Sequence, residues 1–172
     1  ADWCWFENYL TYDNARLSQG LIVGGASAGN QQAIDLGLKT LSWLVEKQKA
    51  PAGHFRRIGC FGFATREGVR AQFDQQPVEA CATVSACLAA HQATDDAAWL
   101  KEARTAFEWF LGSNDLGLEL YDAKTGGCAD GLQENRINQN QGAESTLSFL
   151  IALAEMRLVE SILAPSRQMQ AT

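Results

Sequence analysis

The sequence lacks several features, and each absence disfavours a class of protein. No apolar run approaches the roughly 20 residues of a membrane-spanning helix, and no cluster of lysine and arginine accompanies the net charge of −6. We therefore expect no membrane partner and no nucleic-acid partner. With only three prolines and no low-complexity stretch, we expect no disorder outside the C-terminal tail.

Motifs for metals, cofactors and secretion are equally scarce. His54 and His91 are the only histidines, and neither an HExxH nor a CxxC pattern occurs, so we expect no metal and no cofactor. The five cysteines are irregularly spaced, which is typical of a reducing, cytoplasmic setting. The N-terminus has no initiator methionine and no leader pattern, so we expect a chain that begins within a domain.

Apolar residues at helical spacing recur along the whole chain. The stretch after Pro77 is apolar on nearly all sides, which is typical of a helix covered by neighbours on both faces, whereas the other patterns carry a single apolar stripe. The periodicity predicts five helices, at about residues 14–26, 31–48, 77–92, 97–111 and 142–163.

The connections between these helices alternate between short and long. Short turns near residues 29–30 and 94–96 join antiparallel partners, whereas residues 51–77 and 113–141 are long non-helical stretches. Helix connections in bundles usually take about 2–8 residues, so these loops indicate a ring of inner and outer helices. The predicted fold is all-α, an incomplete (α/α) toroid of helical hairpins with long loops at one rim, including a short β-hairpin near residues 54–74.

Length and composition fit one domain. A chain of 172 residues with 47% hydrophobic content can bury a real core. We expect a partial toroid domain over residues 1–164 and a frayed tail over residues 165–172.

Polar side chains gather just before three of the predicted helices. Residues 73–80 and 138–145 each contain a run of amides followed by a carboxylate, and residues 3–13 add aromatic and acidic side chains before the first helix. Amides offer both donors and acceptors to sugar hydroxyls, and aromatic rings cover the apolar face of a sugar. The pattern predicts a site for a sugar or oligosaccharide at the rim.

Two groups of candidate site residues follow from this pattern. Paired carboxylates can act as acid and base on a glycosidic bond, and the candidate catalytic residues are Asp74, Glu7, Asp13, Glu79 and Glu144. Arg66, Arg70 and Arg136 offer contacts to a phosphate or carboxylate. The candidate substrate-binding residues are Trp3, Trp5, Tyr9, Arg70, Gln75, Gln76, Asn138, Asn140 and Gln141.

Each candidate also has a purely structural interpretation. Glu79 and Glu144 fall in first helical turns, where the helix dipole stabilises a carboxylate. Asp74 precedes a helix and can cap a turn, Trp3 and Trp5 can pack in a core, and the amides can satisfy loop backbone groups. The sequence alone leaves these alternatives open.

Several segments resemble a known family. DWCWFENYLTYDNARLSQGLIVGG, GHFRRIGCFGF, FDQQPVEA, AFEWFLGSNDLG and NQGAESTLSFLIAL are similar to the C-terminal half of a bacterial (α/α) toroid domain. That domain is six-hairpin glycosidase-like and occurs alone or fused behind family 4-type glycosyltransferases. The resemblance implies a ring of six hairpins with a ligand at its mouth. Five helices supply about half of it, so we expect a homodimer over the exposed inner-helix faces.

These features together favour a carbohydrate-processing domain, either glycosidase-like or glycosyltransferase-associated. One alternative is a non-catalytic glycan-binding or interaction domain. Another is a sugar epimerase or isomerase of the same barrel class, although such enzymes usually move protons with histidines.

Overall fold

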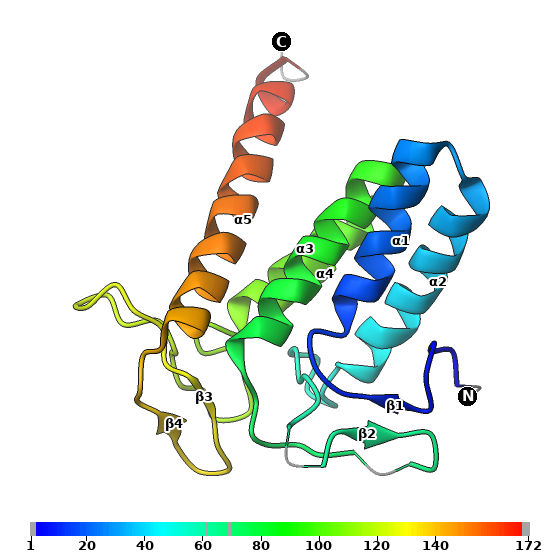
Figure 1. The fold of residues 1–172 in the computed structure, drawn as a ribbon. Helices are drawn as coiled ribbons and strands as arrows, with labels where there is room; N and C mark the ends of the chain where they lie inside the picture. The colour runs from blue at the N-terminus through cyan, green and yellow to red at the C-terminus, as the bar shows by residue number, and fades with distance from the viewer. Residues whose placement is uncertain (1–2, 61, 69, 170–172) are drawn as a thin grey trace.

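The computed structural model describes residues 3–60, 62–68 and 70–169, and the fold over these residues is mostly helical (Figure 1). The predicted all-α class is confirmed. The helices are α1 (Ala15–Ala28), α2 (Gln31–Lys47), α3 (Pro77–Thr94), α4 (Ala97–Glu108) and α5 (Ala143–Met169).

The helix boundaries follow local signals in the sequence. Gly29 ends α1 in the left-handed conformation, and the Asn30 side chain accepts a hydrogen bond from the Ala33 N–H to begin α2. Pro77 occupies the first turn of α3, and Asp96 caps α4 through the Ala98 N–H. Because the connections between them are short, α1–α2 and α3–α4 form antiparallel pairs, as predicted.

Two predicted ends differ from the structure. Helix α4 ends at Glu108 rather than near residue 111, and α5 continues beyond residue 163 to Met169. The division into a domain over residues 1–164 and a frayed tail over 165–172 stays a prediction, because residues 170–172 lie outside the described part of the chain.

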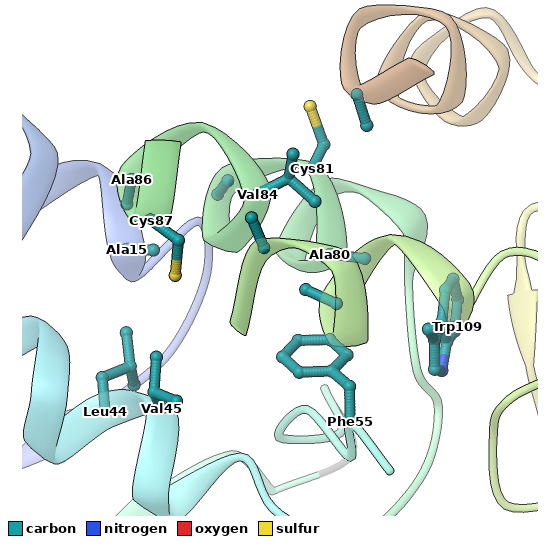
Figure 2. Close-up of a cluster of buried hydrophobic side chains, with 14 of the residues drawn as sticks. Ala15, Leu44, Val45, Phe55, Ala80, Cys81, Val84, Ala86, Cys87 and Trp109 are labelled. Carbon is teal, nitrogen blue, oxygen red and sulfur yellow. The ribbon is translucent and has the colours of Figure 1, made fainter. Parts of the chain in front are cut away.

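Helix α3 lies at the centre of the core. Its side chains Ala80, Cys81, Val84 and Cys87 are fully buried, and α3 packs against α1, α4 and α5 (Figure 2). Neighbours therefore cover it on more than one side, as the apolar pattern after Pro77 predicted, although α2 touches α3 only slightly. The reason is the layering of the helices. Helices α1, α3 and α5 are neighbours in one layer, α2 packs on α1, and α4 packs on α3.

The long loops and the short strands lie at one end of the helices (Figure 1). Strand β1 (Tyr9–Leu10) pairs antiparallel with β2 (Ala64–Thr65), and β3 (Gly131–Leu132) pairs with β4 (Ile137–Asn138). The expected hairpin near residues 54–74 is reduced to one antiparallel bridge between Ala64 and Arg70. Helices α1, α3 and α5 all begin at this end, so their first turns meet the loops.

The α1–α3–α5 layer exposes apolar side chains away from the covering helices. A groove of about 490 Å³ runs between these three helices and is lined by Val23, Leu88, Leu158 and Ile162 among others. No helix within the described residues is long and apolar enough to cross a membrane. The large exposed apolar side chains of α1 and α5 are Leu17, Val23, Leu147, Leu150, Ile151, Leu158 and Ile162.

Candidate functional site

Acidic side chains meet where α1, α3 and α5 begin. Asn14, at the start of α1, donates a hydrogen bond of 3.2 Å to Oε2 of Glu79 in α3. Tyr12 hydrogen-bonds to Glu144 in the first turn of α5. Three segments far apart in the sequence therefore converge here. We call the following residues the helix-start cluster: Tyr12, Asp13, Arg57, Asp74, Glu79 and Glu144.

Glu79 is buried to an unusual degree for a carboxylate. The residue is only 3% exposed, and its Oε1 atom has no hydrogen-bond partner in residues 3–60, 62–68 and 70–169. Burial raises the pKa of Glu79, although Arg57 and the hydrogen bond from Asn14 oppose this effect. A buried carboxylate with an unsatisfied oxygen is costly, so this position is not explained by the helix dipole alone.

Asp13 and Tyr12 occupy the more open side of the cluster. Burial is the main cause that raises the pKa of Asp13, and the nearby Glu144 adds to it, while Arg16 at 3.5 Å works in the opposite direction. The phenol of Tyr12 has its pKa raised by burial and by its hydrogen bond to Glu144. The charge of Glu144 thus acts on Asp13, and the charge of Asp13 acts on Glu79.

Arg57 is the cation at the centre of this cluster. It is 1% exposed, and its guanidinium lies 5.0 Å from the centre of the Trp109 ring. Its Nε and Nη2 atoms have no hydrogen-bond partner within the described part of the chain. Burial lowers the pKa of Arg57 to about 9, while Glu79 and Asp74 favour its charged form. Arg57 therefore stays charged at neutral pH and offsets part of the surrounding negative charge.

Asp74 is the member of the cluster that reaches a surface depression. The depression measures about 520 Å³ and is lined by Phe73, Asp74 and residues 133–136, which include Glu134. One oxygen of Asp74, Oδ1, is buried and has no hydrogen-bond partner among the described residues. Burial raises the pKa of Asp74 and Asp130 adds to this, while Arg57 opposes it. A carboxyl group with a raised pKa beside an aromatic ring and amides suits acid chemistry on a sugar.

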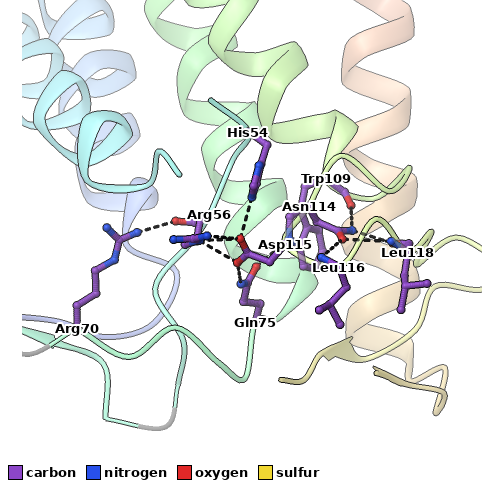
Figure 3. A network of polar contacts seen from close by, with 9 residues as sticks. All are labelled: His54, Arg56, Arg70, Gln75, Trp109, Asn114, Asp115, Leu116 and Leu118. Atoms are coloured by element: carbon purple, nitrogen blue, oxygen red, sulfur yellow. Dashed lines mark hydrogen bonds and ion pairs between the residues drawn. The ribbon is translucent and has the colours of Figure 1, made fainter. Parts of the chain in front are cut away.

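A second polar cluster joins the two long loops around Asp115 (Figure 3). The Asp115 carboxylate accepts hydrogen bonds from His54 Nε2 at 2.8 Å, Arg56 Nε at 2.7 Å and Gln75 Nε2 at 2.7 Å. Gln75 in turn accepts a bond from the Trp109 indole. We call these five residues the Asp115 cluster. Burial alone would raise the pKa of Asp115, but the bonds from Arg56, His54 and Gln75 lower it overall.

The predicted amides of the second loop mostly bond to the loop itself. The Asn140 side chain donates to Asp130, whose carboxylate also accepts from the Gly142 N–H at 2.7 Å. Asn138 accepts from the Asn140 N–H, and Gln141 accepts from Thr125 at 2.8 Å. Burial alone would raise the pKa of Asp130, but the bonds from Asn140, Ser145 and Gly142 lower it overall.

The segment with the candidates Trp3, Trp5, Glu7 and Tyr9 lies beside α2 rather than at the helix starts. Trp3 and Trp5 both pack on Trp43, with ring centres 4.9 and 6.1 Å apart. Trp3 also donates its indole N–H to the carbonyl of Glu7, whose side chain is exposed. Tyr9 lies exposed in β1. This segment is therefore separate from the helix-start cluster.

The remaining two candidates lie on the first loop. The Arg70 guanidinium donates to the carbonyl of Arg56 at 2.9 Å. Gln76 precedes α3 and makes no side-chain cap. Of the substrate-binding candidates, Gln75 is fully buried within the Asp115 cluster, where both ends of its amide are bonded.

Sequence reasoning missed Tyr12 and Arg57 of the helix-start cluster and Glu134 in the depression beside Asp74. It also missed four members of the Asp115 cluster, namely His54, Arg56, Trp109 and Asp115. Arg57 follows Arg56 in an extended segment, where neighbouring side chains point to opposite faces. That alternation was the available signal: Arg56 faces Asp115, and Arg57 faces Glu79 and Asp74. Across the described residues, no group of three histidine, cysteine or acidic side chains is arranged to hold a metal ion.

Comparison with known proteins identifies the fold. No family model matches the sequence, and no curated protein does. Among solved structures the chain is similar to a GH76 α-mannanase of Bacteroides thetaiotaomicron, with a TM-score of 0.63 and 13% sequence identity. The match covers 86% of this chain but only 35% of the mannanase chain. At this identity the likeness establishes an (α/α) toroid arrangement of the helices and not the reaction.

Proposed function

We propose that this chain is a carbohydrate-processing toroid domain, and that it binds a sugar or oligosaccharide in the depression beside Asp74. One observation carries the proposal. Asp74, whose pKa is raised, lines a depression of about 520 Å³ together with an aromatic ring, Phe73, and the amides Gln133 and Asn135. That combination supplies the ring contact, hydrogen-bond partners and acid that a glycosidic substrate needs.

In this proposal Asp74 acts as the acid on the glycosidic oxygen. The second carboxylate is Glu134, which lines the same depression, or Asp13 of the helix-start cluster. Glu79 keeps a supporting role, because it is buried and bonded to Asn14. Glu7 is set aside, because its segment packs against α2.

The test is the variant Asp74→Asn assayed against a panel of oligosaccharides, including α-mannosides. Loss of a general acid lowers turnover by about 10²–10⁴-fold, while the melting temperature stays nearly unchanged because the shape is retained. The matched variants Glu134→Gln and Asp13→Asn identify the second carboxylate. If no sugar of the panel shifts the melting temperature or the tryptophan fluorescence, the proposal fails.

A non-catalytic glycan-binding domain is the second candidate. It is favoured by the fact that the match spans 35% of the mannanase chain, so a full ring has walls that this match does not include. It predicts sugar binding that survives Asp74→Asn with a modest loss and no turnover. An epimerase is less suited, because His54 is engaged by Asp115 and His91 bonds to the carbonyl of Asp96.

Three further proposals concern the oligomeric state, the location and the partner of the domain. A second copy of the chain covers the exposed apolar side chains of α1 and α5, which a lone soluble protein rarely presents together. Light scattering after size exclusion at micromolar concentration tests this, and a clean monomer would contradict it.

Five unpaired cysteines fit a cytoplasmic location, and association with a glycosyltransferase would be tested by co-purification.

A further inference from the structure

A second depression opens beside α2, away from the helix-start cluster. It measures about 430 Å³, and its lining includes two tryptophans, Trp3 and Trp43, and three cations, Lys47, Arg66 and Arg70. We call it the basic depression. Acidic side chains are absent from its lining, whereas the protein as a whole carries a net charge of −6. Positive charge is therefore concentrated here against the overall balance.

The three cations are not used by the fold as ion pairs. Across the part of the chain that is described, none of the three lies within 4.0 Å of a carboxylate oxygen. Lys47 instead lies over the Trp43 ring, with its Nζ 5.5 Å from the ring centre. Arg70 spends one donor on the carbonyl of Arg56, which leaves its other donors available.

The surroundings of Arg70 show the same excess of positive charge. Burial lowers the pKa of Arg70, and the neighbouring cation Arg56 lowers it further, while the more distant Asp115 acts in the opposite direction. Because Arg56 already pairs with Asp115, little negative charge remains for Arg70. An anion entering the basic depression would relieve this repulsion.

The tryptophans are held in place before any ligand arrives. Trp3 packs edge-on to Trp43, and Trp5 stacks on Trp43 from another side. Indole rings provide the flat apolar surface that a sugar ring contacts. A wall of aromatic rings with unpaired cations around it therefore combines the two halves of a site for a charged sugar.

We propose that the basic depression is a second binding site, and that it takes an anionic sugar, meaning a sugar ring that carries a phosphate or a carboxylate. Arg66 and Arg70 contact the anionic group, Lys47 adds a point charge, and the tryptophans contact the ring. The inference rests on the proposed function only for the sugar part of the ligand. It separates charge recognition here from the acid chemistry proposed at Asp74.

The test is a tryptophan fluorescence titration of the whole chain with glucose 6-phosphate, glucuronate, glucose and inorganic phosphate. We expect glucose 6-phosphate or glucuronate to bind at least about tenfold more tightly than glucose or phosphate alone, and binding to weaken with added salt. The two anionic sugars distinguish a phosphate from a carboxylate ligand. Equal affinity for glucose and both anionic sugars would overturn the proposal.

Variants locate the binding. Arg66→Gln, in an exposed turn, and Lys47→Gln should each weaken the anionic sugar several-fold, whereas Arg157→Gln on the exposed face of α5 should not. Asp74→Asn should leave this titration unchanged. Retained affinity in both Arg66→Gln and Lys47→Gln would overturn the proposal. Anionic sugar binding here, with no neutral sugar binding at Asp74, would instead contradict the proposed function alone.

Discussion

The two polar clusters at the loop end of the molecule differ in how completely their atoms are bonded. In the Asp115 cluster, the carboxylate accepts from three side chains, and Gln75 is bonded at both ends of its amide. In the helix-start cluster, Glu79 Oε1, Asp74 Oδ1 and two nitrogens of Arg57 have no hydrogen-bond partner among the residues that the structure describes. Arg57 and Glu79 in the helix-start cluster and Gln75 in the Asp115 cluster are all buried, so burial alone does not account for the difference in bonding.

This difference in bonding agrees with the roles that we propose for the two clusters: a structural role for the Asp115 cluster and chemistry for the helix-start cluster. A satisfied buried network stabilises the fold and fixes the loops, because each charge has its partners. Unsatisfied buried groups cost free energy, and a protein retains them where a ligand or a reaction needs them. The Asp115 cluster therefore holds the first long loop to the second, whereas the helix-start cluster is the region to which we assign the proposed chemistry.

The largest effect is expected for Asp115→Ala. The variant leaves Arg56, His54 and Gln75 without their shared acceptor in a region where the Asp115 side chain is only 4% exposed. Removing one partner of a buried charge network typically costs about 3 kcal/mol or more. Urea denaturation monitored by tryptophan fluorescence measures it.

The control for this change is Asp35→Ala, which removes an exposed carboxylate from α2. Its effect on the free energy of unfolding should stay within about 0.5 kcal/mol. If Asp115→Ala behaves like the control, the Asp115 cluster does not hold the loops, and the comparison between the two clusters breaks down.

A smaller effect is expected for Trp109→Phe, because Trp109 belongs to both regions. Its indole N–H bonds to Gln75, and its ring lies against Arg57. The smaller ring leaves a void and an unpaired Gln75 oxygen, which together cost about 2 kcal/mol. Trp99→Phe is the matched control on α4, where the side chain is only partly buried. Equal losses in both variants would remove Trp109 from its linking role.

The pH dependence of stability should have opposite signs in the two clusters. The pKa of Asp115 is lowered in the folded state, so its contribution is present above about pH 4 and is lost as the pH falls. The pKa of Glu79 is raised, so its contribution is largest below about pH 4 and is lost as the pH rises through the folded-state pKa.

The variants Asp115→Asn and Glu79→Gln test these signs in urea titrations from about pH 2 to about pH 8, which span the ordinary carboxyl pKa. Glu79→Gln should lose part of the decline in stability that the wild type shows on raising the pH, by on the order of 1 kcal/mol. Asp115→Asn should flatten the loss at acid pH. A Glu79→Gln curve that runs parallel to the wild type would show that Glu79 is an ordinary carboxylate.

The sequence predicted the helices and their arrangement better than it predicted the contents of the site. Periodicity located all five helices, and loop length located the rim, because both depend on local patterns. It did not separate Glu7 from Asp13, since both precede α1 and only the packing of Trp3 on Trp43 places the first segment beside α2. Arg57 was missed because burial of an arginine depends on distant partners such as Trp109.

The predicted amides illustrate the same limit. Amides before a helix fit a sugar site and a loop network equally well, because the donors and acceptors are the same. Gln75 proved to be the link between Asp115 and Trp109, and Asn140 bonds to Asp130. Only the bonding partners decide between the two roles, and these come from segments far away in the sequence.

The smallest effect is expected for Gln141→Ala, which sharpens the comparison at the edge of the second loop. The exposed Gln141 side chain accepts from Thr125 at 2.8 Å and lies over Gly127, where an added Cβ would clash with it. Losing this exposed loop bond should cost only a few tenths of a kcal/mol. The partner variant Thr125→Ala should cost somewhat more, because the Thr125 hydroxyl also accepts from the Gly127 N–H at 3.1 Å, and the two losses should not add fully. Neither variant should change sugar binding, because the side chain already serves the loop. A loss of sugar affinity in Gln141→Ala alone would place Gln141 in the binding site and show that a bonded amide can still serve a ligand.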